Sequence, residues 1–323
     1  MNNYLQLLQN VLNNGERRTD RTGTGTISTF SEKLSFDLKD GFPIVTTKYV
    51  SYKTAIHEML WILSGSTDNN VLLKNNVKIW NEWSLPDGSL GPIYGKQLRD
   101  FNGVDQLSNL VYGLKNNPFS RRLIVSYWNP KYLPDETMSP QDNVLEGKQA
   151  LPPCHSFIQW YVSSATDRER LRHLLYLYET CEVSMNEEDV SIVHYPEKFS
   201  DADILDLLTR HNIPTYSLSC QLYCRSQDLC LGTPFNLIMY PLLTMMLAKQ
   251  CGYIYGKYHH VIGDAHIYTD HIENAKLQLD RAPYAKPFMA IRSGVQNIYE
   301  YSIDDFKLYD YNHHPSIYYP VST

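Results

Sequence analysis

The stretch YSLSCQLYCRSQDLCLGTPFNLIMYPLLTMMLAKQC, residues 216–251, decides the fold class of this chain. Its first part, residues 216–223, predicts a β-strand, because polar and apolar side chains alternate as they do on the two faces of a strand. Its last part, residues 234–251, is almost wholly apolar, which predicts a helix covered on every side. A strand followed by a deeply buried helix indicates that helices pack against a sheet.

The other expected helices and strands surround this stretch. Apolar residues at helical spacing predict helices over residues 4–14, 53–64 and 105–117. Alternating or β-branched runs predict further strands at these places: two within 20–38, and one each at 122–127, 155–163 and 260–263. Because helices and strands mix without regular βαβ alternation, the expected class is α+β.

The length and composition exclude several classes of protein. A chain of 323 residues can bury a full core. Its 43% apolar and 20% charged residues are typical of globular proteins and exclude a disordered or collagen-like chain. No apolar run reaches the roughly 20 residues of a membrane helix, and the start lacks the apolar core of a signal peptide. We therefore expect a cytoplasmic protein (host cytoplasm if the source is viral).

The charge and the cysteines restrict the partners. The net charge of −6 argues against a DNA-binding surface, which needs a basic face. Six cysteines are too few for a disulfide scaffold in a chain of this length, so reduced thiols are expected. Residues 163–217 hold 11 acidic and 5 basic residues, and they contain two short amphipathic helices, the second capped by Ser200. This composition indicates a surface elaboration between two strands.

One cysteine stands where a nucleophile could sit. Cys154, in ALPPCHSFIQW, follows two prolines and precedes a strand. A thiol becomes reactive when cations lower its pKa, although a single cysteine is more often an inert apolar residue. Cys220, Cys224 and His259–His260 also offer side chains of the types that bind zinc. On a strand the two cysteines would lie about 13 Å apart, so this site is rejected.

Four arginines lie in loops rich in small residues. Arg21 lies in DRTGTGT, Arg121 and Arg122 in SRR, and Arg225 in CRSQD. Guanidinium groups beside hydroxyls suit a phosphate monoester. The TGTG run lacks the Lys-Ser/Thr ending of a P-loop. A dianion site is therefore possible only if the fold brings these arginines together.

A set of motifs does relate these residues. Read in order, they resemble those of thymidylate synthases: DRTGTGT (20–26), KTAIHEMLW (53–61), IWNEW (79–83), GPIYGKQ (91–97), SRRLIVSYWNP (120–130), LPPCH (151–155), CQLYCRSQDLCLGTPFN (220–236) and GDAHIYTDH (263–271). The resemblance covers nearly the whole chain except about 134–149 and 164–216. It implies a single catalytic domain over 1–323 with insertions in those two places. It also implies a large mixed sheet packed with helices, with the sheets of two subunits forming the interface of a homodimer.

The resemblance implies a reaction as well. Such enzymes transfer a one-carbon unit from 5,10-methylenetetrahydrofolate to C5 of deoxyuridine monophosphate (dUMP), giving dTMP and dihydrofolate. A thiolate that adds to C6 makes C5 nucleophilic, which is covalent catalysis. Cys154 matches the family's nucleophile, Arg225 would favour its thiolate, and Glu58 matches a carboxylate that relays protons. Tyr94 and His155 match the polar supports of that carboxylate. These five residues are the expected catalytic set.

The binding residues follow from the same motifs. Asn236 matches the amide that reads the O4 and N3 edge of uracil, whereas Asp in its place would suit cytosine. The expected substrate-binding set is Arg21, Arg121, Arg122, Ser226, Asp228, Asn236, His266 and Tyr268. Arg121 and Arg122 would reach across from the second subunit. The expected folate-binding set is Lys48, Trp80, Trp83, Leu151 and Asp228. No metal is expected.

Two other functions remain open at this stage. Viral relatives add water instead of hydride to the same intermediate and form a hydroxymethyl nucleotide. The cofactor-side departures from the family pattern, such as Cys230 and the Ser-Thr ending, favour this alternative. Trp80 and Leu151 favour the synthase. A non-catalytic nucleotide-binding protein is the third reading, and the retained Cys154 and Glu58 speak against it.

Overall fold

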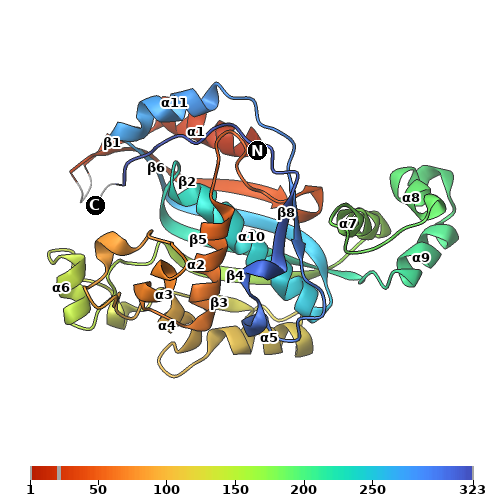
Figure 1. Ribbon diagram of the computed structural model, residues 1–323, viewed down its shortest axis with the longest axis horizontal. Helices are drawn as coiled ribbons and strands as arrows, with labels where there is room; N and C mark the ends of the chain where they lie inside the picture. Colours follow the sequence, from red (N-terminus) through yellow and green to blue (C-terminus); the bar gives the residue numbers. More distant parts are fainter. Residues whose placement is uncertain (1, 20–22, 322–323) are drawn as a thin grey trace.

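A mixed sheet forms the centre of the computed structural model, which describes residues 2–19 and 23–321. Six strands lie in the order β1-β2-β6-β5-β4-β3 (Figure 1). Only β5 and β6 pair in parallel, and the other neighbours are antiparallel. Their bounds are Glu16–Arg18 (β1), Thr26–Asp37 (β2), Ile124–Ser126 (β3), His155–Ser164 (β4), Tyr216–Asp228 (β5) and Ile254–Tyr268 (β6). The α+β class and the mixed sheet are confirmed.

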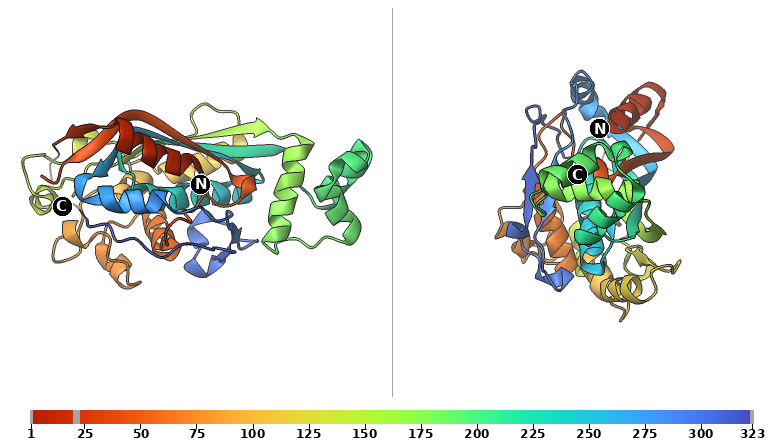
Figure 2. Two further views of the ribbon diagram at one scale, coloured as in Figure 1. Left: turned by 90° about the horizontal axis from the view of Figure 1, so that it is seen from above. Right: turned by 90° about the vertical axis from the view of Figure 1, so that its right-hand side faces the viewer.

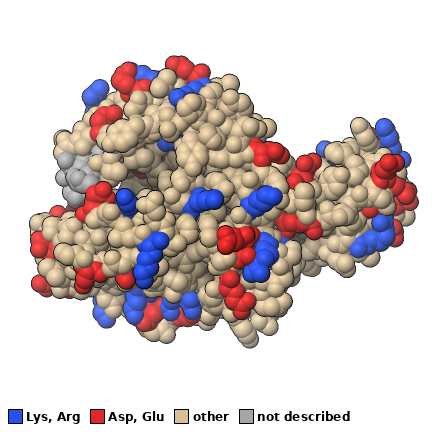
Figure 3. All heavy atoms as spheres, viewed as in Figure 1, with Lys and Arg blue, Asp and Glu red and all other residues tan. Residues whose placement is uncertain are grey.

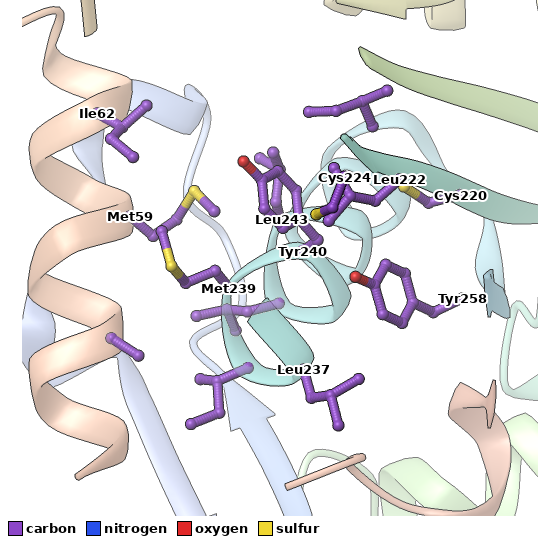
Figure 4. Close-up of a cluster of buried hydrophobic side chains, with 14 of the residues drawn as sticks. Met59, Ile62, Cys220, Leu222, Cys224, Leu237, Met239, Tyr240, Leu243 and Tyr258 are labelled. Atoms are coloured by element: carbon purple, nitrogen blue, oxygen red, sulfur yellow. The ribbon is translucent and has the colours of Figure 1, made fainter. Parts of the chain in front are cut away.

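Helix α10, Gly232–Cys251, is the buried helix that the sequence predicts. It follows β5 after a three-residue turn and packs against β5, β6 and helix α2, Tyr52–Ser64. Figure 4 shows side chains of α2 pointing toward α10 and those of β5 lying on the other side of it. Each fully buried aliphatic side chain stabilises the fold by about 1.5–3 kcal/mol. Pro241 lies inside the helix and supplies no N–H to its hydrogen-bond ladder.

The other helices cover the edges of this core. Helices α1 and α11 lie side by side along one edge (Figures 1 and 2). Their bounds, with those of the remaining helices outside the β4–β5 connection, are Asn2–Asn14 (α1), Asn69–Leu73 (α3), Tyr94–Arg99 (α4), Gln106–Asn116 (α5), Pro140–Leu145 (α6) and Ile272–Leu279 (α11). Among the described residues no helix is long and apolar enough to cross a membrane.

The connection between β4 and β5 forms a separate lobe. Its helices are α7 (Asp167–Glu179), α8 (Glu187–His194) and α9 (Asp201–Arg210), and α8 and α9 project from the body in Figures 1 and 2. Apolar residues of these three helices form a small cluster that also includes Ile254 of β6. A capping box starts each helix, including the predicted Ser200 cap. The two helices predicted here are confirmed, whereas α8 was not predicted.

The C-terminal part returns across the body. Strands β7, Phe288–Ile291, and β8, Phe306–Tyr309, pair as a second small sheet. Residues 310–321, which we call the strap, then run back to α11. There Asn274 donates to the carbonyl of Tyr318 at 2.8 Å, and a ring nitrogen of His271 contacts the carbonyl of Pro320 at 2.7 Å.

Three strand predictions were too short or were divided. The structure has one strand, β2, where two were expected, because Ser31 at φ 69° interrupts the alternation without ending the strand. Strand β5 continues to Asp228 and β6 begins at Ile254, well outside the predicted ranges. The added parts carry charged and polar residues that do not fit a simple apolar alternation.

Candidate active site

Cys154 lies at the entrance of β4 and is fixed through its backbone. Its N–H donates to the hydroxyl of Tyr94 at 3.0 Å, and its carbonyl accepts from the N–H of Arg225 at 3.0 Å. The Arg225 side chain donates to the carbonyls of both prolines before Cys154, and its Nη2 lies 3.9 Å from the Cys154 sulfur. The thiol is partly open to solvent. A fixed cation beside a partly exposed thiol is the kind of setting in which reactive cysteines are found.

Glu58 is a buried carboxyl on the apolar helix α2. The indole N–H of Trp80 donates to its Oε1 at 2.9 Å. Burial raises the pKa of Glu58 to about 7, and the hydrogen bond from Trp80 only partly opposes this shift. The carboxyl can therefore hold or release a proton near neutral pH, which suits general acid–base chemistry.

Aromatic rings connect Glu58 with Cys154. The Trp80 ring lies 6.1 Å from that of Tyr94, and the Tyr94 ring lies 5.1 Å from that of His155. His155 Nδ1 is 2.8 Å from the Tyr240 hydroxyl, and burial lowers the pKa of His155 to about 3. His155 is therefore neutral. The five predicted catalytic residues thus form one connected group.

Asn236 stands in the second turn of α10 and is 2% exposed. Its Nδ2 donates to Oε1 of Gln227 at 2.7 Å and lies 3.8 Å from the sulfur of Cys224. Since α10 begins directly after β5, the amide lies at the same end of the sheet as Arg225. Arg225 also donates to the hydroxyl of Ser226 at 3.2 Å.

The parallel pairing of β5 with β6 adds two more predicted residues. Ser226 pairs with Asp264 and Asp228 with His266, so the residues of both strands meet at one end of the sheet. His266 Nδ1 lies 2.8 Å from a carboxylate oxygen of Asp264, and its ring packs against Tyr268. Five of the predicted substrate-side residues, Ser226, Asp228, Asn236, His266 and Tyr268, therefore lie with Arg225 at one end of the sheet.

The predicted cofactor side lies next to the strap. Lys48 donates to the Cys230 carbonyl at 2.6 Å, and its ammonium lies 4.2 Å from the centre of the Tyr319 ring. Burial lowers the pKa of Lys48 to about 8. The hydroxyl of Tyr319 donates to Gln278 at 2.9 Å. Trp83 packs against Trp80, and the half-buried Leu151 packs against the core.

One group in this area has the side-chain types of a metal site. The ligand atoms of Asp228, Cys230 and His271 lie within 4.8 Å of one another. Asp228 Oδ1 also accepts from the Cys230 N–H at 2.7 Å and lies 3.8 Å from His271 Nδ1. This group does not include Cys220, Cys224 or His260, which the sequence analysis considered as zinc ligands. Cys220 and Cys224 are both buried on β5, and Cys224 contacts His260 Nε2 at 3.3 Å.

The remaining arginines are not assembled within one chain. Arg121 and Arg122 are exposed in the turn before β3. Among the described residues neither side chain forms an ion pair or hydrogen bond, and neither is brought to Cys154. Arg21 falls outside the described residues.

Figure 3 shows a hollow on the face between α11 and α6, beside the strap.

Several residues of the site were missed by sequence reasoning. Gln227, Cys224 and Tyr240 contact predicted site residues directly, and the Arg225 guanidinium lies 5.9 Å from the Trp128 ring. Gln227 and Cys224 lie inside the CQLYCRSQD motif, so their closeness to Arg225 was a usable signal. Tyr240 and Tyr319 reach the site only through the fold.

A partly exposed cysteine beside an arginine, with a carboxyl of raised pKa nearby, defines an arrangement suited to nucleophilic group transfer. The sequence model of thymidylate synthase matches residues 2–180 and 203–323. Thymidylate synthases of Francisella tularensis subsp. holarctica are 42% identical over 98% of both chains. The enzyme of Francisella philomiragia subsp. philomiragia is 41% identical over the same share. The chain belongs to the thymidylate synthase family, and the expected folate-dependent methyltransferase class is confirmed.

Proposed function

We propose that this protein converts dUMP to dTMP with 5,10-methylenetetrahydrofolate, through a covalent bond between Cys154 and C6 of the pyrimidine. The observation that carries the proposal is the position of Cys154 between Arg225 and the Tyr94–Trp80–Glu58 group. Family membership supports the same reaction.

The proposed steps use the residues as they lie. The Cys154 thiolate adds to C6 while Arg225 favours its charge. The electron pair reaches O4, where Asn236 donates a hydrogen bond, and C5 then attacks the methylene carbon of the folate, whose bond to N10 breaks. Glu58, with its pKa near 7, helps to remove the proton from C5, and the bond from the methylene carbon to N5 breaks to release tetrahydrofolate. Hydride from this tetrahydrofolate adds to the methylene carbon as Cys154 leaves C6 as a thiolate, which gives dTMP and dihydrofolate.

The binding roles are proposed on the same geometry. Arg225 and Ser226 would hold the phosphate, with Arg21 from the same chain. His266 and Tyr268 would hold the ribose hydroxyl. Lys48, Trp80, Trp83, Leu151 and Asp228 would line the folate site. A single catalytic domain with insertions at about 134–149 and 164–216 is part of the proposal.

A second copy of the chain would complete the site. Phe157 pairs with Tyr223 across β4 and β5, and Tyr161 lies farther along the same face. These rings are 37%, 37% and 66% exposed, which is unusual for a sheet face that stays in water. We propose that two such faces pack together and that the partner's exposed Arg121 and Arg122 reach the phosphate.

A product analysis tests the proposal. The purified chain is incubated with dUMP and methylenetetrahydrofolate, and the nucleotide is identified by mass. Formation of dTMP with an equal amount of dihydrofolate is expected, because the strap with its buried Tyr319 lies beside the cofactor-side residues. Hydroxymethyl-dUMP with tetrahydrofolate would instead identify the hydroxymethylase. Nucleotide binding without any product would leave only a binding protein.

A further inference from the structure

The amide of Asn236 is surrounded by acceptors on its nitrogen side. Its Nδ2 lies 2.7 Å from Oε1 of Gln227 and 3.8 Å from the sulfur of Cys224. Asn236 is 2% exposed and Gln227 is 4% exposed, so water does not readily replace these contacts. The strong contact is the one with Gln227, and the long one with sulfur is weak.

The Cys224 sulfur also contacts a histidine. His260 Nε2 lies 3.3 Å from the sulfur, and both residues are fully buried. Burial raises the pKa of Cys224 and lowers that of His260 to about 3. A protonated thiol next to a neutral imidazole can donate its proton to Nε2, which leaves the sulfur as an acceptor toward Asn236. Both neighbours of Nδ2 can then act as acceptors.

Gln227 has little room to move. It lies on β5 between the site residues Ser226 and Asp228, and its amide packs against the start of α10. A Cβ atom added at Gly232 would lie 2.4 Å from Nε2 of Gln227, so the glycine provides the space that the glutamine side chain occupies. Gln227 is therefore held against α10 one helical turn before Asn236.

The direction of the Asn236 amide matters because the two pyrimidines present opposite edges. Uracil offers an acceptor at O4 and a donor at N3, whereas cytosine offers a donor at N4 and an acceptor at N3. An asparagine amide fits uracil in one orientation and cytosine when it is turned by 180°. In the turned orientation Oδ1 of Asn236 would face the Cys224 sulfur and, unless the Gln227 amide turned with it, Oε1 of Gln227. A buried acceptor opposite acceptors is strongly disfavoured.

We propose that Gln227 is a positioning residue that sets the pyrimidine specificity by holding the amide of Asn236 in the uracil-reading orientation. This inference rests on the proposed function, in which Asn236 reads the base. Gln227 does not touch the nucleotide. It affects only the relative affinity for dUMP and dCMP. When dUMP binds, O4 of the base replaces the Cys224 sulfur as the second acceptor of Asn236 Nδ2.

The test is equilibrium binding of dUMP and of dCMP to the full-length protein and its variants, without folate. Gln227→Met keeps the length of the side chain but removes the acceptor. We expect the ratio of dUMP to dCMP affinity to fall by roughly tenfold or more, because the turned amide is no longer opposed. Gln227→Glu keeps an acceptor and should retain most of the ratio. Gln6→Met, at an exposed position of α1, is the matched control and should leave it unchanged.

A second variant acts without altering Gln227. Gly232→Ala places a methyl group where the glutamine amide lies, so it should also lower the ratio. This variant serves if Gln227→Met does not fold. A wild-type preference for dUMP that Gln227→Met and Gly232→Ala both retain would overturn the positioning role and leave the proposed function intact. If the wild-type protein bound neither nucleotide, the proposed function would fail, and this inference with it.

Discussion

The two sides of the site are built from different parts of the chain. On the proposed nucleotide side, the described residues other than Arg121 and Arg122 lie on β5, β6 and the second turn of α10. On the proposed cofactor side, Lys48 is covered by Tyr319 of the strap, and contacts of Tyr318, Tyr319 and Pro320 with Asn274, Gln278 and His271 hold the strap there. The first side is part of the core, whereas the second depends on the last residues of the chain. A substitution on one side should therefore change the binding of dUMP or the binding of folate, but not both.

Cys154→Ser should give the largest effect and sharpen this separation. We expect turnover to fall by roughly a thousandfold or more, because a hydroxyl is a far weaker nucleophile than a thiolate. Binding of dUMP should remain, since the proposed nucleotide-binding residues are unchanged. Steady-state kinetics and nucleotide titration measure both quantities. The exposed Cys181→Ser is the control, and substantial turnover of Cys154→Ser would remove Cys154 from the mechanism.

Arg122→Glu tests whether the nucleotide side is complete in one subunit. This variant alone should be nearly inactive, but mixing it with Cys154→Ser should restore activity to about a quarter of the sites. One site of each heterodimer then has an intact Cys154 and the partner's intact arginine. Subunits are exchanged by unfolding and refolding, and heterodimers are isolated with a tag. Heterodimers without any recovered activity would disprove the shared site, and Arg168→Glu is the surface control.

Glu58→Gln separates stability from activity. The ordinary carboxyl pKa of 4.5 rises to about 7 in the folded protein, so the folded state binds the proton more tightly than the unfolded state. The free energy of unfolding of the wild type should therefore fall as pH rises from about 4.5 to 7, by up to about 3 kcal/mol. Glu58→Gln should lose this pH dependence and be relatively more stable at pH 8, although it is catalytically impaired. Urea unfolding at pH 5 and pH 8 checks this, with the exposed Glu82→Gln as control. An unchanged pH dependence in Glu58→Gln would contradict the raised pKa.

Tyr319→Phe should give the smallest effect and act on the cofactor side alone. The variant removes the hydrogen bond to Gln278, which is worth about 1 kcal/mol and corresponds to roughly a fivefold change. The KM for methylenetetrahydrofolate should rise by about that factor, whereas the KM for dUMP stays the same. Tyr318→Phe, at a 79% exposed position, is the control. Equal increases in both KM values would show that the two sides are not independent.

The sequence was most informative where one local signal was strong. The apolar run of α10 and the spaced apolar residues of α1, α2 and α5 predicted those helices correctly. The ends of β5 and β6 were missed because they carry Arg225, Asp228 and His266, which break the apolar alternation. Helix α8 is short, and its caps are clear only once the helix is known.

Local sequence patterns were also insufficient to predict the contacts within the site. Ordered motifs pointed to Cys154 and Glu58 although the two residues are far apart in the chain, because the resemblance carries positional information that local patterns lack. The contact between Gln227 and Asn236, and the covering of Lys48 by Tyr319, depend on how distant segments pack. No local pattern encodes such contacts.

Pro241 has a mechanical consequence for α10. Because proline offers no N–H, the carbonyl of Leu237 loses its partner within the helix, just after the turn that carries Asn236. The helix thus consists of two buried parts of similar length, residues 232–240 and 241–251, joined where one hydrogen bond of the ladder is missing. We expect the first part, which carries Asn236, to open more readily than the second. In hydrogen exchange, amides before Pro241 should therefore exchange faster than those after it.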